Sequence, residues 1–374
     1  MNKEPIRIAQ IMGKWVGGGV ESFVMNYYRH IDRSKIQFDF ICDEDSSDIP
    51  YSEIKSLGGR VIICPPYQKI FKYIKFLKSL FKDNDYKIVH SHINTLSVFP
   101  LYSARKAGVP IRIAHSHSTS SKKEWKRNII KKLLRHFSKK YSNVYFACSE
   151  EAAKFQFGNK AYDNNEVEII NNAIDVESFK YNDKIRKQIR KSLNISNDCI
   201  VIGHVGRFVS VKNHIFLIDL FKEIYKKNNN YRLLLIGQGP MFKNIKNEVE
   251  RLKLSNCIFF LGQKSNIQDY YSAMDIFLLP SLYEGLGLVL VEAQSSGLHC
   301  ISSSNVPKMV NCGNLVKFIQ LENKEKWEKE ILNADFSRIN CINEIKKSGF
   351  DIKNEAKKLE RKYKQYIDEK GESL

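Results

Sequence analysis

The run Ile200-Val201-Ile202-Gly203-His204 sets the architecture of the 374-residue chain, because a pattern that has ended begins again there. Before this run, short β-rich apolar segments alternate with longer amphipathic ones, and the alternation stops at the polar, turn-forming Asn171-Asn172-Ala173-Ile174-Asp175. After the run, the same alternation repeats to the end of the chain. Since such alternation is typical of βαβ units and parallel sheets, we expect two doubly wound α/β domains.

The predicted elements follow one another in a similar order in both halves. Strands are expected near 6–12, 36–42, 60–64, 87–91, 111–115 and 143–147, and again near 199–204, 231–236, 257–261, 275–279, 299–302 and 315–318. Helices are expected at 20–31, 69–82, 95–107 and 121–140, between the strands of the second half, and at 351–369, where Ala356, Leu359, Tyr363 and Tyr366 mark an apolar face.

These elements place the domains at 1–172 and 173–351, with the last helix, about 352–374, packing back on the first domain. Ligands of open α/β sheets bind at the carboxyl ends of the strands. The active site is therefore expected in a cleft that the two domains face.

Composition narrows the class of protein. The chain is 43% hydrophobic and 27% charged, which is ordinary for a globular protein, and no run approaches the roughly 20 apolar residues of a membrane span. None of the eight cysteines forms a Cys-x-x-Cys pair, so buried thiols in a cytoplasmic protein are expected. The formal charge of +19 predicts an anionic partner, which could be nucleic acid, a membrane surface or a substrate.

A glycine-rich loop follows the first predicted strand and opens a helix. In Trp15-Val16-Gly17-Gly18-Gly19-Val20-Glu21, consecutive glycines let backbone N–H groups approach a ligand, and the helix N-terminus favours an anion. The loop fits neither a dinucleotide fingerprint nor a phosphate loop. It therefore indicates either a phosphate or sugar contact or a plain tight turn.

Two further motifs lie in the second half. In Gly206-Arg207-Phe208-Val209-Ser210-Val211-Lys212-Asn213, the guanidinium and the ammonium suit a diphosphate, although both could be solvated surface cations. The second motif runs from Glu284 through Gly285, Leu286, Gly287 and Leu288 to Glu292. Its two carboxylates could serve the two sugars of a nucleotide sugar, or could be incidental on a buried helix; an unpaired Glu292 would be costly there, which favours a ligand.

In order and domain position, these motifs resemble those of the retaining glycosyltransferases of family 4, especially the bacterial exopolysaccharide and capsule enzymes. The resemblance covers essentially the whole chain and includes the turn Gly237-Gln238-Gly239-Pro240. It implies the GT-B architecture, two Rossmann-like domains facing a cleft, of which the first binds the acceptor and the second binds the nucleotide sugar. It also implies transfer, with retention, of a hexosyl or N-acetylhexosaminyl group from a UDP-sugar to a hydroxyl of a polyprenyl-diphosphate-linked saccharide in cell-surface polysaccharide synthesis.

The resemblance also assigns roles to single residues. Arg207 and Lys212 would hold the donor diphosphate and the leaving group, so that no metal or other cofactor is expected. Glu284 would bind the donor sugar and Glu292 the ribose. The remaining implied donor contacts are Gly18 and Gly19, the amides of Leu286, Gly287 and Leu288, and the backbone of Gln263. Gly19 would face either the acceptor or the donor phosphate. A histidine after the fifth strand would lie near the donor sugar, and His115 and His117 are both candidates.

The chain departs from the family pattern in three places, one of which is the pair of His-Ser-His triplets, His90–His92 and His115–His117. Leu286 replaces a common aromatic residue, and Ser304-Asn305-Val306-Pro307-Lys308 replaces a glycine pair and glutamate, which puts a donor contact from that loop in doubt.

Two metal hypotheses arise as well. The triplets His90–His92 and His115–His117 bring four imidazoles to neighbouring strand ends, but no recognised metal spacing surrounds them, so zinc is disfavoured. Asp43-Glu44-Asp45 fits a D-x-D cation motif, and a solvated turn is the favoured interpretation.

The basic residues gather on two amphipathic stretches, 69–82 and 122–140, in the first domain. Basic amphipathic helices can dock on anionic lipid, so a peripheral position on the inner face of the cell membrane is expected. An ordinary helix with a solvated lysine face is the alternative. Two other functions compete: a sugar-nucleotide epimerase of the same architecture and a nucleic-acid-binding protein, although no nucleic-acid-binding module is recognisable.

Overall fold

The computed structural model describes residues 4–117, 134, 137 and 139–371. The chain divides into two compact units, Met1–Ala173 with Ile352–Leu374, and Ile174–Asp351. The division falls one residue from the predicted boundary, and the C-terminal helix belongs to the first unit. Most of the predicted helix 121–140 lies outside the described residues.

The first unit is a doubly wound parallel sheet. Over the described residues its strands run in the order β3-β2-β1-β4-β5-β6-β7. Its elements are β1 (Ile6–Gly13), α1 (Gly19–His30), β2 (Ile36–Asp43), α2 (Tyr51–Ser56), β3 (Arg60–Cys64), α3 (Ile70–Asp83), β4 (Ile88–Ser91), a 3₁₀ turn (Asn94–Ser97), α4 (Val98–Lys106), β5 (Ile111–Ser116), β6 (Val144–Ala147), α6 (Glu150–Phe157), α7 (Asn159–Asp163), β7 (Val167–Ile169) and α15 (Ile352–Gly371).

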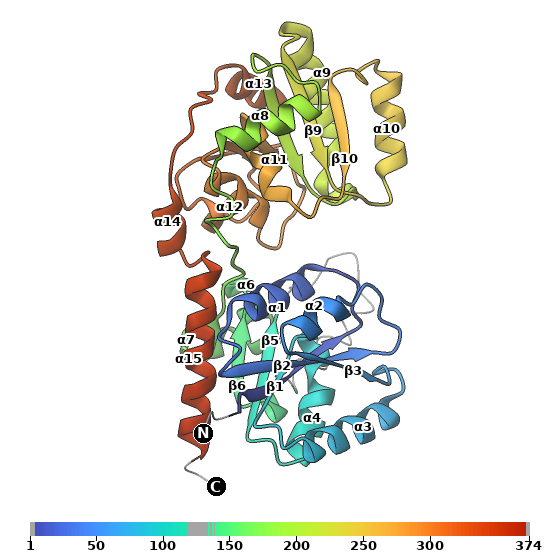
Figure 1. Ribbon diagram of the computed structural model, residues 1–374, viewed down its shortest axis with the longest axis vertical. Helices are drawn as coiled ribbons and strands as arrows, with labels where there is room; N and C mark the ends of the chain where they lie inside the picture. The colour runs from blue at the N-terminus through green and yellow to red at the C-terminus, as the bar shows by residue number, and fades with distance from the viewer. Residues whose placement is uncertain (1–3, 118–133, 135–136, 138, 372–374) are drawn as a thin grey trace. The chain divides into compact units, whose positions relative to one another are not determined.

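Alternate residues of the central strand β1 enter two separate cores. Ile8 packs with α1 and α15 on one face of the sheet, and Ile11 packs with α3 and α4 on the other (Figure 1). Burial on both faces explains why these strands are apolar throughout rather than alternating. It also explains why α15 belongs to this unit, since Leu359 and Tyr363 complete its first core.

The second unit repeats the arrangement. Its parallel strands run in the order β10-β9-β8-β11-β12-β13. Its elements are α8 (Asp183–Ser192), β8 (Ile200–Val205), a 3₁₀ turn (Ser210–Lys212), α9 (His214–Lys227), β9 (Tyr231–Ile236), α10 (Phe242–Arg251), β10 (Ile258–Gly262), α11 (Ile267–Ala273), β11 (Ile276–Leu279), α12 (Leu288–Ser295), β12 (His299–Ser303), a 3₁₀ turn (Lys308–Val310), β13 (Val316–Ile319), α13 (Lys324–Leu332) and α14 (Ile342–Lys347).

The expected fold class, two Rossmann-like α/β units, is confirmed. Each predicted strand is present with its ends shifted by at most one residue. The structure adds β7, which was not predicted as a strand because it is only three residues long and lies at the edge of its sheet. Within the described residues, no helix is both long and apolar enough to cross a membrane.

Candidate active site

Each sheet has a point where the strand order reverses. In the first unit it lies between β1 and β4, and in the second between β8 and β11. At such a point the loops that leave the carboxyl ends of the two strands diverge, which opens a crevice where ligands of doubly wound sheets bind. The glycine-rich loop and His92 follow β1 and β4, whereas the Arg207–Lys212 loop and Glu284 follow β8 and β11.

Phe208 anchors the loop after β8. Its ring is fully buried, its amide N–H donates to the carbonyl of Gln238 at 2.9 Å, and its own carbonyl accepts from the amide of Met241 at 2.9 Å. This anchor fixes the loop that carries the two cations. Arg207 is exposed, and Lys212 is partly buried.

Lys212 contacts one of the predicted glutamates directly. Its Nζ lies 2.6 Å from Oε1 of Glu284, and the hydroxyl of Ser281 donates to the same oxygen at 2.6 Å. Both side chains of the ion pair are largely buried, with 17% and 12% exposed. The interpretation of Lys212 as a solvated surface cation is therefore wrong, since the structure places it in a polar cluster at the switch point.

Glu292 lies inside α12 and is also partnered. The hydroxyl of Tyr271 donates to its Oε2 at 2.7 Å. Burial raises the pKa of Glu292, while the hydrogen bond from Tyr271 and the nearby charge of Lys212 act in the opposite direction. Glu292 is therefore not an unpaired carboxylate, because Tyr271 is its hydrogen-bond partner. The argument that Glu292 needs a ligand to offset its burial no longer holds.

The amides predicted to contact phosphate lie at the start of α12. Gly287 has φ +89° and precedes Leu288, the first residue of the helix; a Cβ at Gly287 would lie 3.0 Å from Val306. The backbone conformation therefore favours glycine, and the space beside Val306 is tight for any larger residue. The helix N-terminus presents free N–H groups and the positive end of its dipole, which favours an anion.

Glycines bring the neighbouring strand ends close together. The amide of Gly237 donates to the carbonyl of Gly262 at 2.9 Å, and a Cβ on Gly237 would lie only 2.1 Å from the carbonyl oxygen of Gly206. The loops after β8, β9 and β10 thus lie against one another. Gln263 is exposed at the far end of this row, two strands from β8.

In the first unit, the two His-Ser-His triplets form one cluster. His90 Nε2 lies 3.1 Å from His115 Nδ1, and His92 Nδ1 lies 2.9 Å from His117 Nε2. Each pair ends on a group of another element: His90 Nδ1 lies 2.7 Å from the hydroxyl of Tyr363, and His92 Nε2 lies 2.8 Å from Oε1 of Gln10. Burial holds the pKa of all four below the ordinary value, that of His117 at about 3, so the imidazoles are neutral.

Gln10 orients the hydrogen bonds of this cluster. Because its Oε1 can only accept, His92 carries its proton on Nε2, and its Nδ1 must accept from His117 Nε2–H. This leaves the lone pair of His117 on Nδ1. His117 is also the member of the cluster that is partly exposed, whereas His115 is fully buried. Of the two candidates, His117 is therefore the one a ligand can reach.

The same cluster bears on the zinc hypothesis. Nitrogen atoms of His90, His92 and His115 all lie within 4.8 Å of one another, close enough to suggest metal ligands. Within the described residues, however, every ring nitrogen of these three except His115 Nε2 already has a hydrogen-bond partner. The arrangement is therefore accounted for by hydrogen bonding alone, and a metal would have to displace those bonds.

The glycine-rich loop is a helix cap. Glu21 accepts from the amide of Val16 at 3.0 Å and from that of Gly18 at 3.1 Å, and its carboxylate would lie 3.0 Å from a Cβ on Gly18. A Cβ on Gly19 would meet nothing within 4 Å. Both oxygens of Glu21 are therefore engaged by the loop, whereas Gly19 borders open space.

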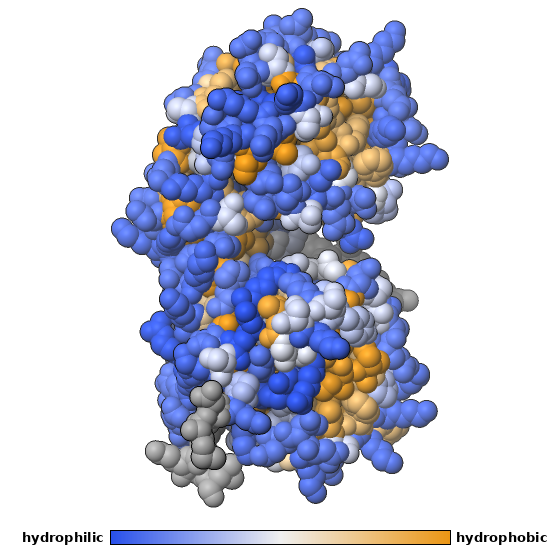
Figure 2. Space-filling model, viewed as in Figure 1, coloured by the Kyte–Doolittle hydropathy of each residue, from blue (hydrophilic) through white to orange (hydrophobic). Residues whose placement is uncertain are grey.

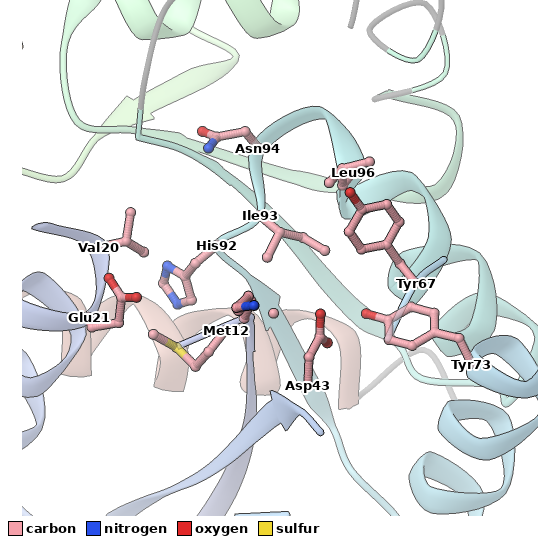
Figure 3. Close-up of a pocket in the computed structure, with 12 residues that line it drawn as sticks. Met12, Val20, Glu21, Asp43, Tyr67, Tyr73, His92, Ile93, Asn94 and Leu96 are labelled. Atoms are coloured by element: carbon pink, nitrogen blue, oxygen red, sulfur yellow. The ribbon is translucent and has the colours of Figure 1, made fainter. Parts of the chain in front are cut away.

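A cavity of about 260 Å³ lies at the switch point of the first sheet (Figure 3). Its lining comprises Met12, Gly13, Lys14, Val20, Glu21, Asp43, Tyr67, Tyr73, His92, Ile93, Asn94 and Leu96. The interpretation of 43–45 as a solvated turn is wrong for Asp43, which ends β2 and is 2% exposed. Glu44 and Asp45 are indeed at the surface, in ion pairs with Lys69 and Lys14.

Several contacts of the site were not predicted from sequence. The sequence did not predict the contacts of Tyr271, Ser281 and Gln10. A hydroxyl or an amide becomes a hydrogen-bond partner only when the fold brings it close to a site residue. Tyr363 was expected solely as part of the apolar face of α15. Its ring does pack in the core, but its hydroxyl also meets His90.

Solved structures with the same arrangement define the class. HepE from Anabaena, determined with UDP and glucose, covers 96% of this chain and 100% of its own with a TM-score of 0.76 and 15% identity. A glycosyltransferase from Rickettsia africae covers 98% and 99% with a TM-score of 0.78 and 16% identity. The chain thus has the GT-B fold of these enzymes.

Sequence comparison specifies the family. The model described as Glycosyltransferase Family 4 matches residues 17–178, and the one described as Glycosyl transferases group 1 matches residues 185–317. The putative glycosyltransferase EpsF of Bacillus subtilis is 35% identical over 89% of each chain. An Escherichia coli UDP-Gal:α-D-GlcNAc-diphosphoundecaprenol α-1,3-galactosyltransferase is 25% identical over 96% of each. The chain therefore belongs to glycosyltransferase family 4, and the resemblance stated from its motifs is confirmed.

Proposed function

We propose that this glycosyltransferase transfers a hexosyl or N-acetylhexosaminyl group from a UDP-sugar to a hydroxyl of a polyprenyl-diphosphate-linked saccharide, with retention, in cell-surface polysaccharide synthesis. The cluster of Lys212, Glu284 and Ser281 beside exposed Arg207 carries the proposal, because it joins phosphate-binding cations to a sugar-binding carboxylate at the switch point of the second sheet. The names of the B. subtilis and E. coli relatives support it. So does the Staphylococcus aureus capsular polysaccharide glycosyltransferase CapH, 28% identical over 80% of this chain and 81% of its own.

In the proposed reaction, the bond between the anomeric carbon and the diphosphate breaks as the acceptor oxygen bonds to the same face of that carbon. The acceptor proton passes to a phosphate oxygen of the leaving UDP. Arg207, Lys212 and the amides of Gly287 and Leu288 stabilise the negative charge that develops there, and such electrostatic stabilisation is usually the largest catalytic contribution. Because these groups neutralise the diphosphate, no metal ion is needed.

The remaining assignments concern the two sugars. Glu284 binds hydroxyls of the donor sugar, Glu292 the ribose, and Gln263 the base through its backbone. Gly18, Gly19, Leu286 and one histidine complete the donor contacts. His117 takes that last role, because His115 is buried.

A donor panel tests the proposal. UDP release is measured with UDP-glucose, UDP-galactose, UDP-N-acetylglucosamine and UDP-N-acetylgalactosamine, with and without a synthetic sugar-diphosphate-lipid acceptor. We expect acceptor-dependent release with one donor, unchanged by EDTA, and NMR of the product should show the anomeric configuration of the donor. An altered free sugar nucleotide would indicate an epimerase instead. Loss of activity in EDTA that Mg²⁺ restores would overturn the metal-independent mechanism.

We further propose that the enzyme acts at the cytoplasmic face of the membrane, held there through α3. The lysines of this helix at 72, 75, 78 and 82 are exposed, Phe71 is 87% exposed, and Ile63 of β3 is 42% exposed. Figure 2 shows hydrophobic surface over β3 and α3 with hydrophilic side chains around it. Apolar side chains flanked by lysines suit an anionic bilayer surface. The second predicted stretch, 122–140, lies mostly outside the described residues.

Vesicle sedimentation tests this attachment. The chain should bind vesicles that contain anionic phospholipid, less well as salt rises, and should not bind neutral vesicles. Phe71→Ser should weaken binding severalfold, while Tyr51→Ser, a change at another exposed aromatic residue, should not. Equal retention on neutral and anionic vesicles would contradict the proposal.

A further inference from the structure

The histidine cluster contains more than the imidazole assigned to the donor. Tyr363 reaches it from α15, which packs against the first sheet (Figure 1), although it lies 273 residues from His90 along the sequence. Its hydroxyl lies 2.7 Å from His90 Nδ1 and 3.5 Å from Gln10 Nε2. The proposed reaction uses His117 alone, which leaves the role of the buried polar groups behind it open.

The amide of Gln10 fixes the direction of the hydrogen bonds. Its Oε1 accepts from His92 Nε2–H at 2.8 Å, and its Nε2 donates to the hydroxyl of Tyr363 in a long bond of 3.5 Å. The two ends of an amide cannot exchange these roles unless the group turns over. Because the phenolic oxygen receives a hydrogen from Gln10, its own hydrogen is directed at His90 Nδ1.

The rest of the cluster continues in the same direction. Burial holds the pKa of the four imidazoles below the ordinary value, so each ring carries one proton. His90 accepts on Nδ1, so its Nε2–H donates to His115 Nδ1 at 3.1 Å. On the other side, His117 Nε2–H donates to His92 Nδ1 at 2.9 Å. One hydrogen-bond chain therefore runs, donor to acceptor throughout, through His117, His92, Gln10, Tyr363, His90 and His115.

This hydrogen-bond chain has two possible directions, and they present opposite groups at His117. In the observed direction, all four imidazoles carry their proton on Nε2, and His117 Nδ1 is an acceptor. If every bond were reversed, all four would carry it on Nδ1, and His117 would present a donor. The tautomer of a neutral imidazole is set by the hydrogen bond that its other nitrogen makes. The direction is therefore decided by the amide of Gln10 and the hydroxyl of Tyr363.

Packing prevents the rings from exchanging their nitrogens by turning over. The ring of His117 is stacked on that of His115, with centroids 4.0 Å apart, and meets Phe23 edge to face at 5.0 Å. His90, His92 and His115 are all buried. Since buried side chains are close-packed in fixed rotamers, the direction can change only when protons move between the ring nitrogens.

We propose that Gln10 and Tyr363 are positioning residues of the transfer reaction, which hold His117 as a hydrogen-bond acceptor for a hydroxyl of the donor sugar. The inference rests on the proposed function, because that function assigns His117 to the donor. Gln10 and Tyr363 are each 1% exposed, so they act through the hydrogen-bond chain rather than by touching the substrate. The C-terminal helix thereby sets what His117 offers to a ligand.

NMR of the full-length protein with ¹⁵N-labelled histidine tests the direction, because the ring shifts distinguish Nε2–H from Nδ1–H tautomers. We expect the Nε2–H form for His90, His92, His115 and His117. His204 is an internal reference of the opposite kind, since its Nδ1 lies 2.9 Å from the carbonyl of Leu278 and must donate to it. An Nδ1–H form of His117 in the wild type would overturn the proposal.

Gln10→Met removes the amide and keeps a side chain of similar length. His92 Nε2–H would then be buried without its acceptor, so His92 and His117 should change to the Nδ1–H form. The kcat for UDP release should fall about fivefold, as expected for one lost hydrogen bond. Gln37→Met is the matched control, because Gln37 is also a buried amide of the first sheet and accepts from the Tyr28 hydroxyl at 2.7 Å. It should change neither the tautomers nor kcat.

Tyr363→Phe tests the other positioning residue. It leaves Gln10 Nε2 without its acceptor, so the amide can turn over and both tautomers of His117 should be populated. The kcat should fall about twofold, less than in Gln10→Met, because part of the His117 population keeps the acceptor. A single Nε2–H form of His117 in this variant would remove Tyr363 from the proposal.

A double-mutant cycle separates positioning from a general loss of stability. In a His117→Ala background, Gln10→Met should lower kcat no further, because the group through which Gln10 acts is gone. An equal fall in both backgrounds, or an unchanged His117 tautomer in Gln10→Met, would overturn the positioning role. If no donor releases UDP, the proposed function fails and the role in transfer fails with it. The tautomers are measured without substrate, so they distinguish that outcome from failure of the hydrogen-bond chain itself.

Discussion

At the switch point of the second sheet, Lys212 pairs with Glu284 beside exposed Arg207, and the N-terminus of α12 begins after Gly287. At the switch point of the first sheet, neutral imidazoles and the buried carboxylate of Asp43, which accepts a hydrogen bond from the thiol of Cys64, occupy the corresponding position. Both sheets share one order around the central strand, with β2, β1 and β4 matched by β9, β8 and β11. The fold thus supplies two equivalent crevices, and the loop residues alone give the second one cations beside a helix N-terminus and the first one uncharged imidazoles beside a buried carboxylate.

The largest expected effect is on kcat, from removal of a cation in the crevice of the second sheet. Lys212→Ala should lower kcat about 10²–10³-fold, or about 3–4 kcal/mol, the usual loss when a group that stabilises developing negative charge is removed. Steady-state UDP release measures it. Lys317→Ala, which breaks an exposed pair with Glu330, is the matched control and should be silent. A change in kcat within threefold for Lys212→Ala would show that the two crevices do not differ as described.

The two buried aspartates of β2 should respond in opposite directions. Asp39→Asn should destabilise the first unit by about 2–3 kcal/mol, because it breaks the pair with Arg7. Asp43→Asn should stabilise it by about 1–2 kcal/mol at pH 8, because the folded state carries a pKa raised to about 6 and disfavours the ionised form. Calorimetry of the variants measures both effects.

The pH dependence of that difference follows from the same shift. A group whose pKa is raised by folding stabilises the fold below its unfolded pKa, and this stability is lost as the pH rises through the folded pKa. The gap between wild type and Asp43→Asn should therefore open between about pH 4 and 6 and stay constant above. The buried histidines also respond to acid, but they are common to both proteins and cancel. A gap independent of pH would rule out ionised Asp43 as its cause.

The histidine cluster should separate catalysis from stability. His117→Ala should lower kcat about tenfold and destabilise the fold by only about 1–2 kcal/mol, because His117 is partly exposed and its Nδ1 has no hydrogen-bond partner among the described residues, while its Nε2–H bond to His92 is lost. His115→Ala should mainly destabilise the fold, since its ring is fully buried against Phe23, with centroids 5.1 Å apart. Kinetics and thermal unfolding of the same two variants distinguish them. The reverse pattern would assign the substrate contact to His115.

The smallest effect concerns the helix that supports the cluster from outside the sheet. Tyr363→Phe should destabilise the first unit by about 1–2 kcal/mol, because His90 Nδ1 would stay buried without its partner at 2.7 Å. Tyr366→Phe removes a hydrogen bond from the same helix to the partly exposed carboxylate of Glu168, which water can replace, and should cost less. If calorimetry shows no loss of stability for Tyr363→Phe, water replaces the hydroxyl and α15 contributes packing alone.

Much of the fold could be predicted because its signals are local. Apolar runs such as Ile200–Val205 form strands that are buried on both faces, and the amphipathic stretches between them form helices that cover the sheet. Both patterns can be recognised within a few residues, without knowledge of distant contacts. The strand ends were predicted to within a residue. The three-residue β7 was missed because so short an edge strand carries almost no pattern of its own.

The residues of the candidate site could be predicted only where the side chain is charged and lies in a motif. Arg207, Lys212, Glu284 and Glu292 could be named from charge, spacing and family resemblance. Their partners Ser281 and Tyr271 could not, because a hydroxyl is ordinary in sequence and gains its role from distances of 2.6 and 2.7 Å across the fold.

By itself, the sequence determined two Rossmann-like units and the family, because hydrophobic periodicity and motif order survive without coordinates. Tertiary structure alone decided which titratable groups are paired. Asp39 and Asp43 lie four residues apart on one strand, yet Asp39 forms an ion pair with Arg7 whereas Asp43 lines the cavity. Burial and partnership depend on what other strands and helices bring alongside, and that information lies in the packing of distant segments rather than in any stretch of the chain.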